Sequence, residues 1–466
     1  MDPRLEAVVK AYDVRGRSPE QLDAGLARAL GAAFAGETEI SDGRGKAVVG
    51  RDMRASSPEI AGAIADGIRS RGAGVVDIGL ASTDMLYCAS GVLNVPGVMV
   101  TASHNPAGDN GLKMCRAGAR PIGLDTGLSA MAEAAGPLLD AEPAESERPG
   151  ELEELEFLDT YVATLLDLAP VSGRRLTVAV DAGNGMAGHT VPAVFDALRA
   201  SGLDVDLVPL YLELDGTFPN HEANPLDHST LVDLQHAVRE NDADIGLAFD
   251  GDADRCFVID ETGEVVSPSA ITGLIATRHL AIEPGATILH NVITSKAVPE
   301  IVAEHGGTAV RTAVGHSLIK AEMARTGAVF GGEHSGHFYF REFYLADSGM
   351  LAALHVLAAL AETDRPAADD GKIRTVSDLM AEFLRYSSSG EINSRVDDAA
   401  AVLERLESEY DQHDLDHLDG LTVTADDWWF NVRSSNTEPL LRLNVEGADD
   451  ATMARVRDDV LAVIRS

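Results

Sequence analysis

The sequence predicts an α/β fold: three related α/β domains with mixed, mainly parallel sheets, followed by a smaller C-terminal α+β domain. Three observations predict it. The chain has 466 residues, which is too long for one ordinary domain. A strand–helix–strand pattern occurs three times, and a different pattern follows toward the C-terminus. Apolar residues make up 45% of the chain and charged residues 24%, so we expect a packed core.

The repeated pattern is a short Val/Ile-rich run, a helical segment closed by Gly, and a second apolar run. The three copies span residues 46–79, 176–210 and 286–315. Apolar runs that end at Gly, Asp or Asn and alternate with helical segments are typical of βαβ units with parallel strands. Because the same order recurs, we infer three duplicated α/β units.

Acidic, proline-containing segments at 138–156 and 361–372 mark the ends of the first and third α/β domains. We expect the first segment to be a solvated hinge that leads into a helix. Beyond the second segment the patterns indicate helices near 376–384, 397–410 and 451–465, and strands at 420–425, 428–435 and 440–447. The predicted domains are therefore residues 1–150, 151–259, 260–368 and 369–466.

The chain is strongly acidic, with 75 acidic and 37 basic residues and a net charge of −38. Nucleic acid is therefore not an expected partner, because phosphate backbones are bound by Lys and Arg. No apolar segment has the length of a signal sequence or a membrane helix. The three cysteines show neither disulfide nor zinc-ligand spacing. We expect a cytoplasmic protein without a membrane partner.

The strongest local pattern lies after the apolar run 245–249, which predicts a buried parallel strand. Asp250, Asp252 and Asp254 follow at its C-terminal end, where ligands collect in open α/β sheets. Alternate side chains of an extended segment share one face, so the three carboxylates can converge. Hard oxygen ligands that repel one another predict a Mg²⁺ site. An acidic turn is the alternative.

Ser103 lies in a polar, glycine-containing loop after a second apolar strand, residues 98–100. The backbone of such a loop can approach a ligand closely. The Ser–His pair suggests a hydrolase, but adjacent side chains of an extended chain point to opposite sides, so His104 is not expected to deprotonate Ser103. Lys113 could reach the serine and offer a charge or a proton-transfer group. Ser103 could be a nucleophile, a carrier of a covalent group, a helix cap or an ordinary loop serine.

Two further polar loops could bind a phosphorylated sugar. Glu333 and Ser335, within 331–340, offer an acceptor and a donor suited to sugar hydroxyls, and a metal site that uses the nearby histidines is the alternative. Residues 432–439 combine Arg433 with hydroxyls and turn N–H groups, which is typical of a phosphate cradle. An ordinary polar hairpin turn would show the same pattern.

These four motifs, in this order and one per predicted domain, resemble the α-D-phosphohexomutase superfamily over essentially the whole chain. TASHNP resembles its phosphoserine loop, DGDADR its metal loop, GEHSGH its sugar loop and RSSNTEP its phosphate loop. The segments KAYDVRG and FDGDADRCF are most similar to the bacterial phosphomannomutase/phosphoglucomutase branch, particularly the phosphomannomutases. The resemblance implies interconversion of mannose 6-phosphate and mannose 1-phosphate through a phosphoserine and a hexose 1,6-bisphosphate.

By this resemblance Ser103 carries the transferred phosphoryl group. It also binds Mg²⁺ together with Asp250, Asp252 and Asp254. The implied catalytic residues are Ser103, His104, Lys113, Arg255, His316 and His337, with Lys113, His316 or His337 as the proton-transfer group. The implied substrate-binding residues are Tyr12, Arg15, Lys296, Lys320, Glu333, Ser335, Arg433, Ser435, Asn436 and Thr437. His334 stands where many members have Met or Gln. The expected cofactors are Mg²⁺ and a hexose 1,6-bisphosphate primer, and the expected assembly is a monomer or homodimer.

Other functions share part of this pattern. A phosphoglucomutase, a dual-specificity enzyme or a phosphoglucosamine mutase would have the same four motifs. A phosphatase of the haloacid dehalogenase type would use Asp250 as its nucleophile. A non-catalytic phosphosugar-binding protein would keep the loops without turnover.

Overall fold

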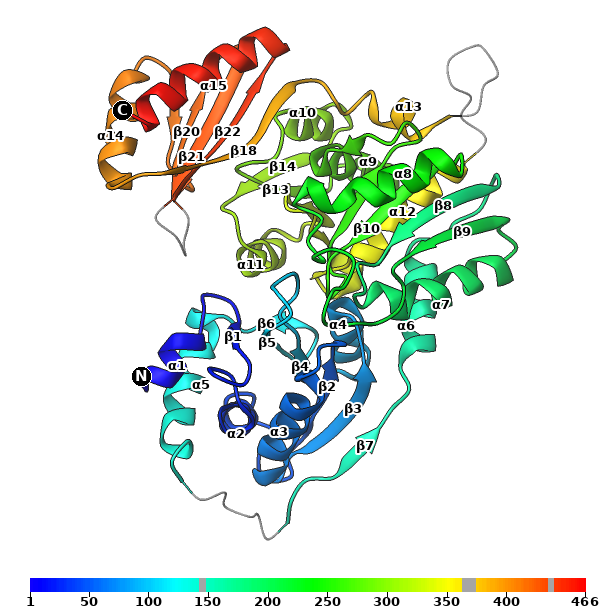
Figure 1. The fold of residues 1–466 in the computed structure, drawn as a ribbon, viewed down its shortest axis with the longest axis vertical. Helices are drawn as coiled ribbons and strands as arrows, with labels where there is room; N and C mark the ends of the chain where they lie inside the picture. The colour runs from blue at the N-terminus through cyan, green and yellow to red at the C-terminus, as the bar shows by residue number, and fades with distance from the viewer. Residues whose placement is uncertain (142–147, 363–373, 435–439) are drawn as a thin grey trace. The chain divides into compact units, whose positions relative to one another are not determined.

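The computed structural model describes residues 1–141, 148–362, 374–434 and 440–466 (Figure 1). The described chain forms two compact units. The first unit comprises Met1–Val266 and Ser335–Ser377, and the second comprises Ser267–His334 and Asp378–Ser466. The strands form four sheets. Three of them combine with helices into α/β domains, and the fourth belongs to a C-terminal α+β domain, which confirms the predicted fold class.

The first sheet, in the first unit, has the strand order β1-β5-β4-β2-β3-β7, with β6 beside β5. β2 pairs in parallel with β3 and β4, as the βαβ pattern predicts, whereas β5 is antiparallel to β4 and β1. Its strands are β1 (Val14–Arg17), β2 (Lys46–Arg51), β3 (Gly74–Leu80), β4 (Gly97–Val100), β5 (Asp109–Arg116), β6 (Arg120–Pro121) and β7 (Leu152–Glu154). Its helices are α1 (Pro3–Val8), α2 (Ala24–Glu37), α3 (Ser57–Ser70), α4 (Thr83–Leu93) and α5 (Leu128–Ala135).

The second sheet, also in the first unit, has the order β12-β11-β10-β8-β9. β10 and β9 flank β8 in parallel, and β11 returns antiparallel to β10. All five residues of β10 are buried, as its apolar sequence predicts. Its strands are β8 (Leu176–Asp181), β9 (Val205–Leu210), β10 (Ile245–Phe249), β11 (Cys256–Ile259) and β12 (Val265–Val266). Its helices are α6 (Leu158–Leu168), α7 (Ala187–Ala200) and α8 (Val232–Glu240).

The elements of the third α/β domain are divided between the two units. In the second unit, β13 (Thr287–Asn291) pairs in parallel with β14 (Thr308–Thr312) and β15 (Phe330–Gly332), again as predicted. The helices there are α9 (Pro268–Ile282), α10 (Ala297–Glu304) and α11 (His316–Thr326). In the first unit, β16 (Phe338–Phe340) pairs antiparallel with β17 (Ala346–Asp347), and α12 (Gly349–Ala361) follows.

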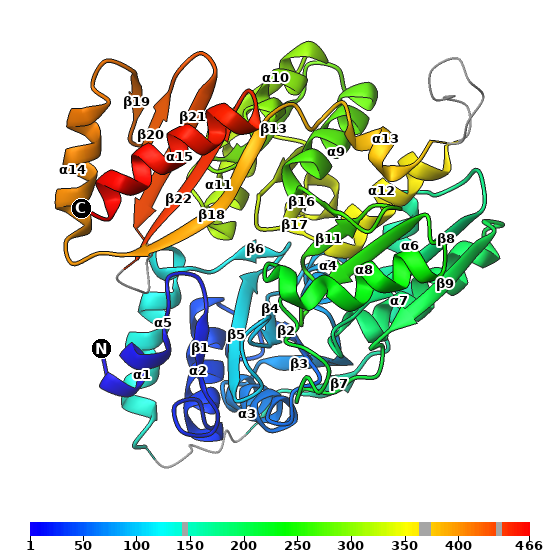
Figure 2. The same cartoon turned by 45° about the horizontal axis from the view of Figure 1, so that its top comes forward.

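The C-terminal sheet, in the second unit, is antiparallel throughout, with the order β18-β22-β21-β20-β19. Figure 2 shows α15 (Asp450–Ile464) lying across this sheet, and buried Val456, Val460 and Ile464 join its core. The strands are β18 (Ser387–Arg395), β19 (Asp414–Asp416), β20 (Leu421–Thr424), β21 (Trp428–Ser434) and β22 (Leu440–Gly447), and the other helices are α13 (Val376–Met380) and α14 (Ala399–Glu409). Of these C-terminal elements, α13 alone has its first two residues, Val376 and Ser377, in the first unit.

Three short or polar strands differ from the sequence analysis. The acidic segment 138–156, expected to be a solvated hinge, contains β7, which extends the first sheet by pairing in parallel with β3. β18 and β19 are the edge strands of the C-terminal sheet, and most of their residues are polar and not buried. Edge strands of this kind lack the apolar alternation on which strand prediction depends.

The second acidic segment, 361–372, falls almost entirely outside the described residues. The four domain boundaries set from the two acidic segments stay predictions. None of the helices that the structure describes combines the length and the apolar character needed for a membrane span.

Asp84 is a buried carboxylate that joins three helices of the first unit. It accepts hydrogen bonds from the hydroxyls of Ser82, Tyr161 and Ser348, at 2.5, 2.7 and 2.6 Å. Ser82 caps α4, Tyr161 lies on α6 and Ser348 caps α12. Burial raises the pKa of Asp84 from 3.8 to about 6, although the three hydroxyls act against the rise.

Replacing Asp84 by Asn should remove a pH dependence from the stability of the first unit. The folded state keeps a proton on Asp84 up to about pH 6, whereas the unfolded chain releases it near pH 3.8. The stabilising contribution is therefore complete below the lower value and is lost as the pH rises through the upper one, by about 3 kcal/mol. Urea unfolding of the wild type and D84N at several pH values measures this difference.

Glu133→Gln, on the exposed side of α5, is the matched control and should leave the pH dependence unchanged. A difference in unfolding free energy between the wild type and D84N that stays constant with pH would contradict the assignment.

Candidate active site

Ser103 lies in the loop that connects β4 to β5, here called the serine loop (residues 101–109). Its φ of +53° is in the left-handed region, which residues other than glycine rarely adopt. The backbone N–H of Ser103 donates to the hydroxyl of Thr101 at 3.0 Å, which supports this turn. Ser103 is only 1% exposed, so its hydroxyl faces the interior of the first unit.

The expectation that His104 points away from Ser103 is wrong. Nδ1 of His104 lies 3.2 Å from Oγ of Ser103. The prediction assumed an extended backbone, and the left-handed conformation of Ser103 brings the two side chains together instead. His104 is nevertheless a weak base, because Arg255 first, then burial and Arg15, lower its pKa from 6.5 to about 2. Its Nδ1 is also a hydrogen-bond partner of the Arg255 guanidinium.

Asp250, Asp252 and Asp254 lie together where β10 ends, in the acidic loop (residues 250–254). All three are buried, and one carboxylate oxygen of each lies within 4.8 Å of the others. The hydroxyl of Ser103 donates to Oδ2 of Asp250 at 2.8 Å, which joins the serine loop to the acidic loop. Gly251 permits this approach, because a Cβ at that position would lie 2.4 Å from the carbonyl oxygen of Ser103.

Lys113, on β5, lies between two of these carboxylates. Its Nζ donates to Oδ2 of Asp252 at 2.6 Å and to Oδ2 of Asp254 at 2.5 Å. Burial acts to lower the pKa of Lys113, but the two carboxylates outweigh burial and raise that pKa above its ordinary value. Lys113 is therefore a fixed positive charge in this arrangement.

Thr83, the first residue of α4, supports the acidic loop from the side of the first sheet. Its hydroxyl donates to Oδ2 of Asp252 at 2.5 Å, and its backbone N–H donates to the carbonyl of Asp252 at 2.9 Å. Burial acts to raise the pKa of Asp252, but Lys113 and this hydroxyl outweigh it, so the pKa lies below its ordinary value. Burial dominates at Asp250 and raises its pKa in spite of the nearby Arg255.

Arg255 closes the other side of the serine. Its Nη2 donates to Oγ of Ser103 at 3.1 Å, and its Nε forms an ion pair with Oδ2 of Asp250 at 3.1 Å. The Ser103 hydroxyl oxygen is therefore held between a carboxylate and a guanidinium. Such a pair would orient any group attached to that oxygen.

His337 reaches this site from a distant part of the chain through an isolated antiparallel bridge with Arg255. Its Nε2 lies 3.7 Å from Oδ1 of Asp254, and its Nδ1 lies 2.9 Å from Oγ of Ser335. Asp254, His337 and the buried Asp347 offer ligand atoms that lie within 4.8 Å of one another. The structure thus brings two of the predicted sugar-loop residues, Ser335 and His337, to the acidic loop.

Arg15 lies on β1, the strand next to β5, and contacts the serine loop from there. Its Nη1 donates to Oδ1 of Asn105 at 2.8 Å, and its Nε pairs with Asp13 at 2.7 Å. Tyr12 lies just before β1 and is half-buried. Both residues were predicted as substrate contacts.

Glu333, Lys320, Arg433 and Lys296 are the described members of the predicted substrate-binding set in the second unit. Glu333 is buried and accepts hydrogen bonds from Nδ2 of Asn291 at 3.1 Å and from the N–H of Gly315 at 3.3 Å. Lys320, on α11, is also buried. Arg433, on β21, donates from Nη2 to Oε2 of Glu391 at 3.1 Å.

Lys296 caps α10 with its backbone, and its Nζ lies 3.5 Å from the carbonyl oxygen of Asp426. His334 has its Nδ1 3.1 Å from Oγ of Ser269 on α9. The side chain of His316 and all of Ser435, Asn436 and Thr437 lie outside the described residues.

The acidic loop fits a divalent cation. Within the part of the chain that the structure describes, Oδ1 of Asp252 and Oδ1 of Asp254 are buried and have no hydrogen-bond partner. Three converging buried carboxylates are stable only with strong positive compensation, of which Lys113 supplies part. All-oxygen sites of this kind suit Mg²⁺.

Sequence analysis did not single out Thr83 or Arg54. Arg54 lies in the turn after β2, and its Nη2 donates to the carbonyl of Ser103 at 2.9 Å. The signal that could have found them is position, because both follow the C-terminal ends of parallel strands, where ligands collect. Polar residues are common in all such loops, so the residue type alone did not separate these two.

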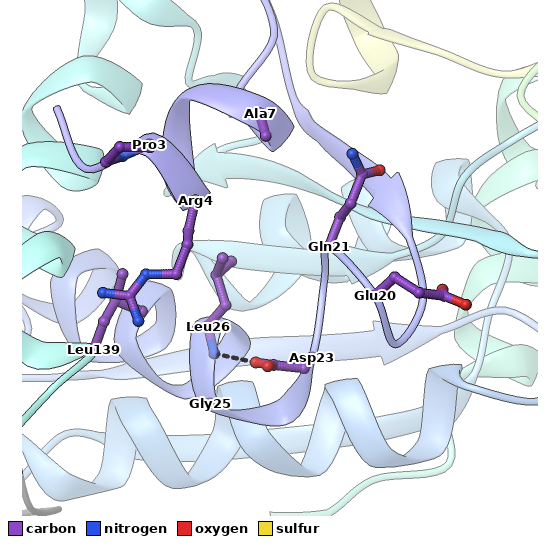
Figure 3. A pocket seen from close by; sticks show the side chains of 9 residues that line it. All are labelled: Pro3, Arg4, Ala7, Glu20, Gln21, Asp23, Gly25, Leu26 and Leu139. Carbon is purple, nitrogen blue, oxygen red and sulfur yellow. Dashed lines mark hydrogen bonds between the residues drawn. The ribbon is translucent and has the colours of Figure 1, made fainter.

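The pocket drawn in Figure 3 lies elsewhere in the first unit and has a volume of about 380 Å³. One of its lining residues, Asp23, caps α2 by accepting from the N–H of Leu26. Another, Arg4, pairs with Asp2 and Asp140. These polar groups serve the local fold, and none of the predicted site residues lines the pocket.

Four family domains match the chain in order. Residues 6–134, 156–263 and 267–382 match the domains described as phosphoglucomutase/phosphomannomutase, alpha/beta/alpha domains I, II and III. Residues 391–463 match the C-terminal domain of the same family.

Relatives that span the whole chain carry related names. A protein of Xanthomonas campestris pv. campestris (strain B100) named "Phosphohexose mutases" is 41% identical over 457 residues, covering 96% of each chain. A phosphomannomutase of Salmonella typhimurium (strain LT2) is 39% identical over 462 residues, covering 98% of each. The crystal structure of a phosphoglucomutase/phosphomannomutase family protein from Burkholderia thailandensis has a TM-score of 0.86 at 33% identity, covering 99% of this chain and 97% of the other.

The fold and these matches define an enzyme of the phosphohexomutase class, an isomerase that works by phosphotransfer. More specifically, the chain belongs to the phosphoglucomutase/phosphomannomutase family, which confirms the resemblance found in its four motifs.

Gly251→Ala should reduce the mutase kcat about 100-fold, because displacement of reacting groups by roughly 1 Å has an effect of that size. The new Cβ would lie 2.4 Å from the carbonyl oxygen of Ser103, so the serine loop and the acidic loop must separate. Steady-state turnover of a phosphohexose measures the effect.

Gly108→Ala is the matched control, because it lies in the serine loop and a Cβ there would meet no atom within 4 Å. The two variants would show equal activity if close contact between the loops did not matter.

Proposed function

We propose that this phosphohexomutase interconverts mannose 6-phosphate and mannose 1-phosphate through a phosphorylated Ser103 and a hexose 1,6-bisphosphate. The observation that carries the proposal is the placement of the Ser103 hydroxyl, 2.8 Å from Asp250 and 3.1 Å from the Arg255 guanidinium. A phosphoryl group on that oxygen would meet both the acidic loop and a strong donor. The phosphomannomutase name of several relatives supports mannose as the sugar.

Asp250, Asp252 and Asp254 would hold Mg²⁺ together with the phosphate on Ser103. When bound, the cation neutralises charge on the transferring phosphoryl group. Catalysis of phosphoryl transfer is largely positioning and charge neutralisation, which Arg255 and Lys113 also provide from this chain.

In the first transfer, a hydroxyl oxygen of the sugar phosphate forms a bond to phosphorus and the bond to Oγ of Ser103 breaks. The hydroxyl proton passes to a base, and Oγ leaves as an alkoxide that takes up a proton. The resulting bisphosphate then presents its other phosphate, whose phosphorus is attacked by Ser103 in the reverse sense. Each cycle thus returns the serine to its phosphorylated form. A bisphosphate primer can phosphorylate an enzyme molecule whose Ser103 has lost its phosphoryl group.

Lys113, His104 and His337 differ in their suitability for proton transfer. Lys113 is held protonated by Asp252 and Asp254, so it suits the supply of a fixed positive charge. His104 is kept neutral by Arg255 and makes a poor base. We assign acceptance of the hydroxyl proton to His337, whose ring lies beside Asp254 and is oriented by Ser335.

The remaining predicted residues would bind the sugar and the phosphate that is not transferred. Glu333 and Ser335 would contact sugar hydroxyls, together with Tyr12 and with Arg15, which contacts the serine loop. Arg433 would grip the distal phosphate. Others in this group are Lys296, Lys320, Ser435, Asn436 and Thr437, with His316 as a further proton-transfer candidate.

Ser103→Ala should abolish both the phosphorylated state and turnover. Intact-protein mass spectrometry of the wild type after incubation with a hexose 1,6-bisphosphate should show one added phosphoryl group, and S103A should show none. Alanine suits this test because it keeps the Cβ that the left-handed backbone already tolerates.

Ser70→Ala, which removes a hydroxyl at the end of α3, is the control and should keep the added mass and the activity. A phosphoryl group that persists in S103A and is lost in Asp250→Asn would instead support a phosphatase with Asp250 as nucleophile.

The substrate is tested by comparing kcat/KM for mannose 1-phosphate, glucose 1-phosphate and glucosamine 1-phosphate with Mg²⁺ and primer. We expect mannose 1-phosphate to be used at least as well as glucose 1-phosphate. Comparable rates would indicate a dual-specificity phosphohexose mutase, the broader name carried by one relative. A large preference for glucose or glucosamine would overturn mannose as the named substrate.

A further inference from the structure

Arg54 binds the backbone of the serine loop with all of its terminal guanidinium groups. Nη2 donates to the carbonyls of Ser103 at 2.9 Å and Asn105 at 2.7 Å. Nη1 donates to the carbonyls of Pro106 at 2.7 Å and Asp109 at 3.0 Å. One buried side chain therefore gathers four carbonyl oxygens of a single loop around one planar group.

Several neighbours fix the guanidinium itself. Nε of Arg54 pairs with Oδ2 of Asp52 at 3.2 Å, and both side chains are fully buried. Asp52 also accepts from the hydroxyl of Ser57 at 2.5 Å and from the N–H of Arg54 at 3.0 Å. The ring of Phe218 covers the guanidinium at 5.1 Å. A Cβ at Gly216 would lie 2.6 Å from Cα of Arg54, so the segment 216–218 seals this side.

The serine loop needs such support because it contains a strained turn. Ser103 has a φ of +53°, and conformations of this kind persist only where the surroundings hold them. The carbonyl that Arg54 binds belongs to Ser103 itself, and the same carbonyl faces Gly251 of the acidic loop. The Arg54 hydrogen bond therefore acts on the residue whose hydroxyl must meet Asp250.

We propose that Arg54 is a positioning residue for phosphoryl transfer. It holds the backbone of Ser103 so that Oγ stays between Asp250 and Arg255 in every cycle, and it makes no contact with the reacting atoms. This inference rests on the proposed role of Ser103 as carrier of the phosphoryl group. It assigns to the GRDMR turn after β2 a part in catalysis that none of the four motifs contains.

The four acceptors explain why an arginine is required. A guanidinium presents its N–H donors in a fixed plane, so Nη1 and Nη2 can donate to four carbonyls while its charge faces Asp52. A lysine ammonium has three donors around one atom and would leave buried carbonyls of the loop unpaired. Arg54→Lys therefore keeps the charge next to Asp52 while it releases part of the loop.

The test measures kcat and KM for mannose 1-phosphate and the ³¹P resonance of phosphorylated Ser103 in R54K. We expect kcat to fall about 100-fold while KM changes less than about threefold, because the loss is in alignment and not in substrate binding. The ³¹P line should shift or broaden, because the phosphate samples more than one position.

Arg51→Lys is the matched control, since Arg51 ends β2 three residues earlier and its Nη1 makes only a long contact, 3.5 Å, with the carbonyl oxygen of Asp52. R51K should keep the wild-type kcat and ³¹P line. A kcat for R54K within threefold of the wild type, or an unchanged ³¹P line, would overturn the proposal. So would a loss of activity that only follows the fraction of unfolded protein, measured by circular dichroism.

If R54K does not fold, Phe218→Leu tests the positioning role of Arg54 instead. It removes the ring over the guanidinium and leaves every hydrogen bond of Arg54 in place. We expect a smaller fall in kcat, about tenfold, with KM unchanged and the same direction of change in the ³¹P line. A wild-type kcat and ³¹P line in F218L would count against Arg54 as a positioning residue.

The phosphoserine role of Ser103 and the positioning role of Arg54 are overturned by different outcomes. A wild-type enzyme that never acquires a phosphoryl group on Ser103 overturns the proposed function, and with it this inference. A wild-type enzyme that is phosphorylated and active, beside an R54K variant that behaves identically, overturns the positioning role alone.

Discussion

Charge compensation among buried groups governs the candidate active site. Three carboxylates of the acidic loop are buried, and buried charges persist only when they are paired or bound to a cation. Lys113 reaches them from the first sheet, and Arg255 reaches them from the start of β11 in the second. The Lys113 pairings require the ends of the two sheets to meet, and Gly251 leaves the space in which they do. The close approach of the serine loop to the acidic loop brings the hydroxyl of Ser103 to Asp250, and this hydrogen bond helps to hold the strained turn at Ser103.

Sequence patterns predicted the parts of this arrangement that depend on local periodicity. The three βαβ units were recognisable because apolar runs and helical segments alternate in β2–α3–β3, β8–α7–β9 and β13–α10–β14. The acidic loop was recognisable because its alternating carboxylates follow a wholly apolar strand, and strand ends in α/β sheets face ligands. The motifs also carried the family resemblance that the domain matches confirm.

What sequence could not provide is contact between distant segments and departures from ideal backbone. The position of His104 follows from one φ angle at Ser103, which no residue pattern reveals. Lys113 on the first sheet pairs with Asp252 and Asp254 at the end of the second. Thr83 bonds to Asp252 over a still larger separation in sequence. The edge strands β18 and β19 were missed because an edge strand can be polar on both faces.

Pairing also suggests how so acidic a chain would bind phosphate at the proposed site. A net charge of −38 opposes the approach of an anion, so a general positive field is not what attracts it. Lys113 and Arg255 are already held against carboxylates, and Arg433 shares Glu391 with Arg442. Donors held in this way lose little freedom when a phosphate arrives, and they present fixed directions rather than diffuse charge. In the proposed function a phosphate would have to match the geometry of the donors within each unit, which would discriminate against anions of other shapes in a way that net charge cannot.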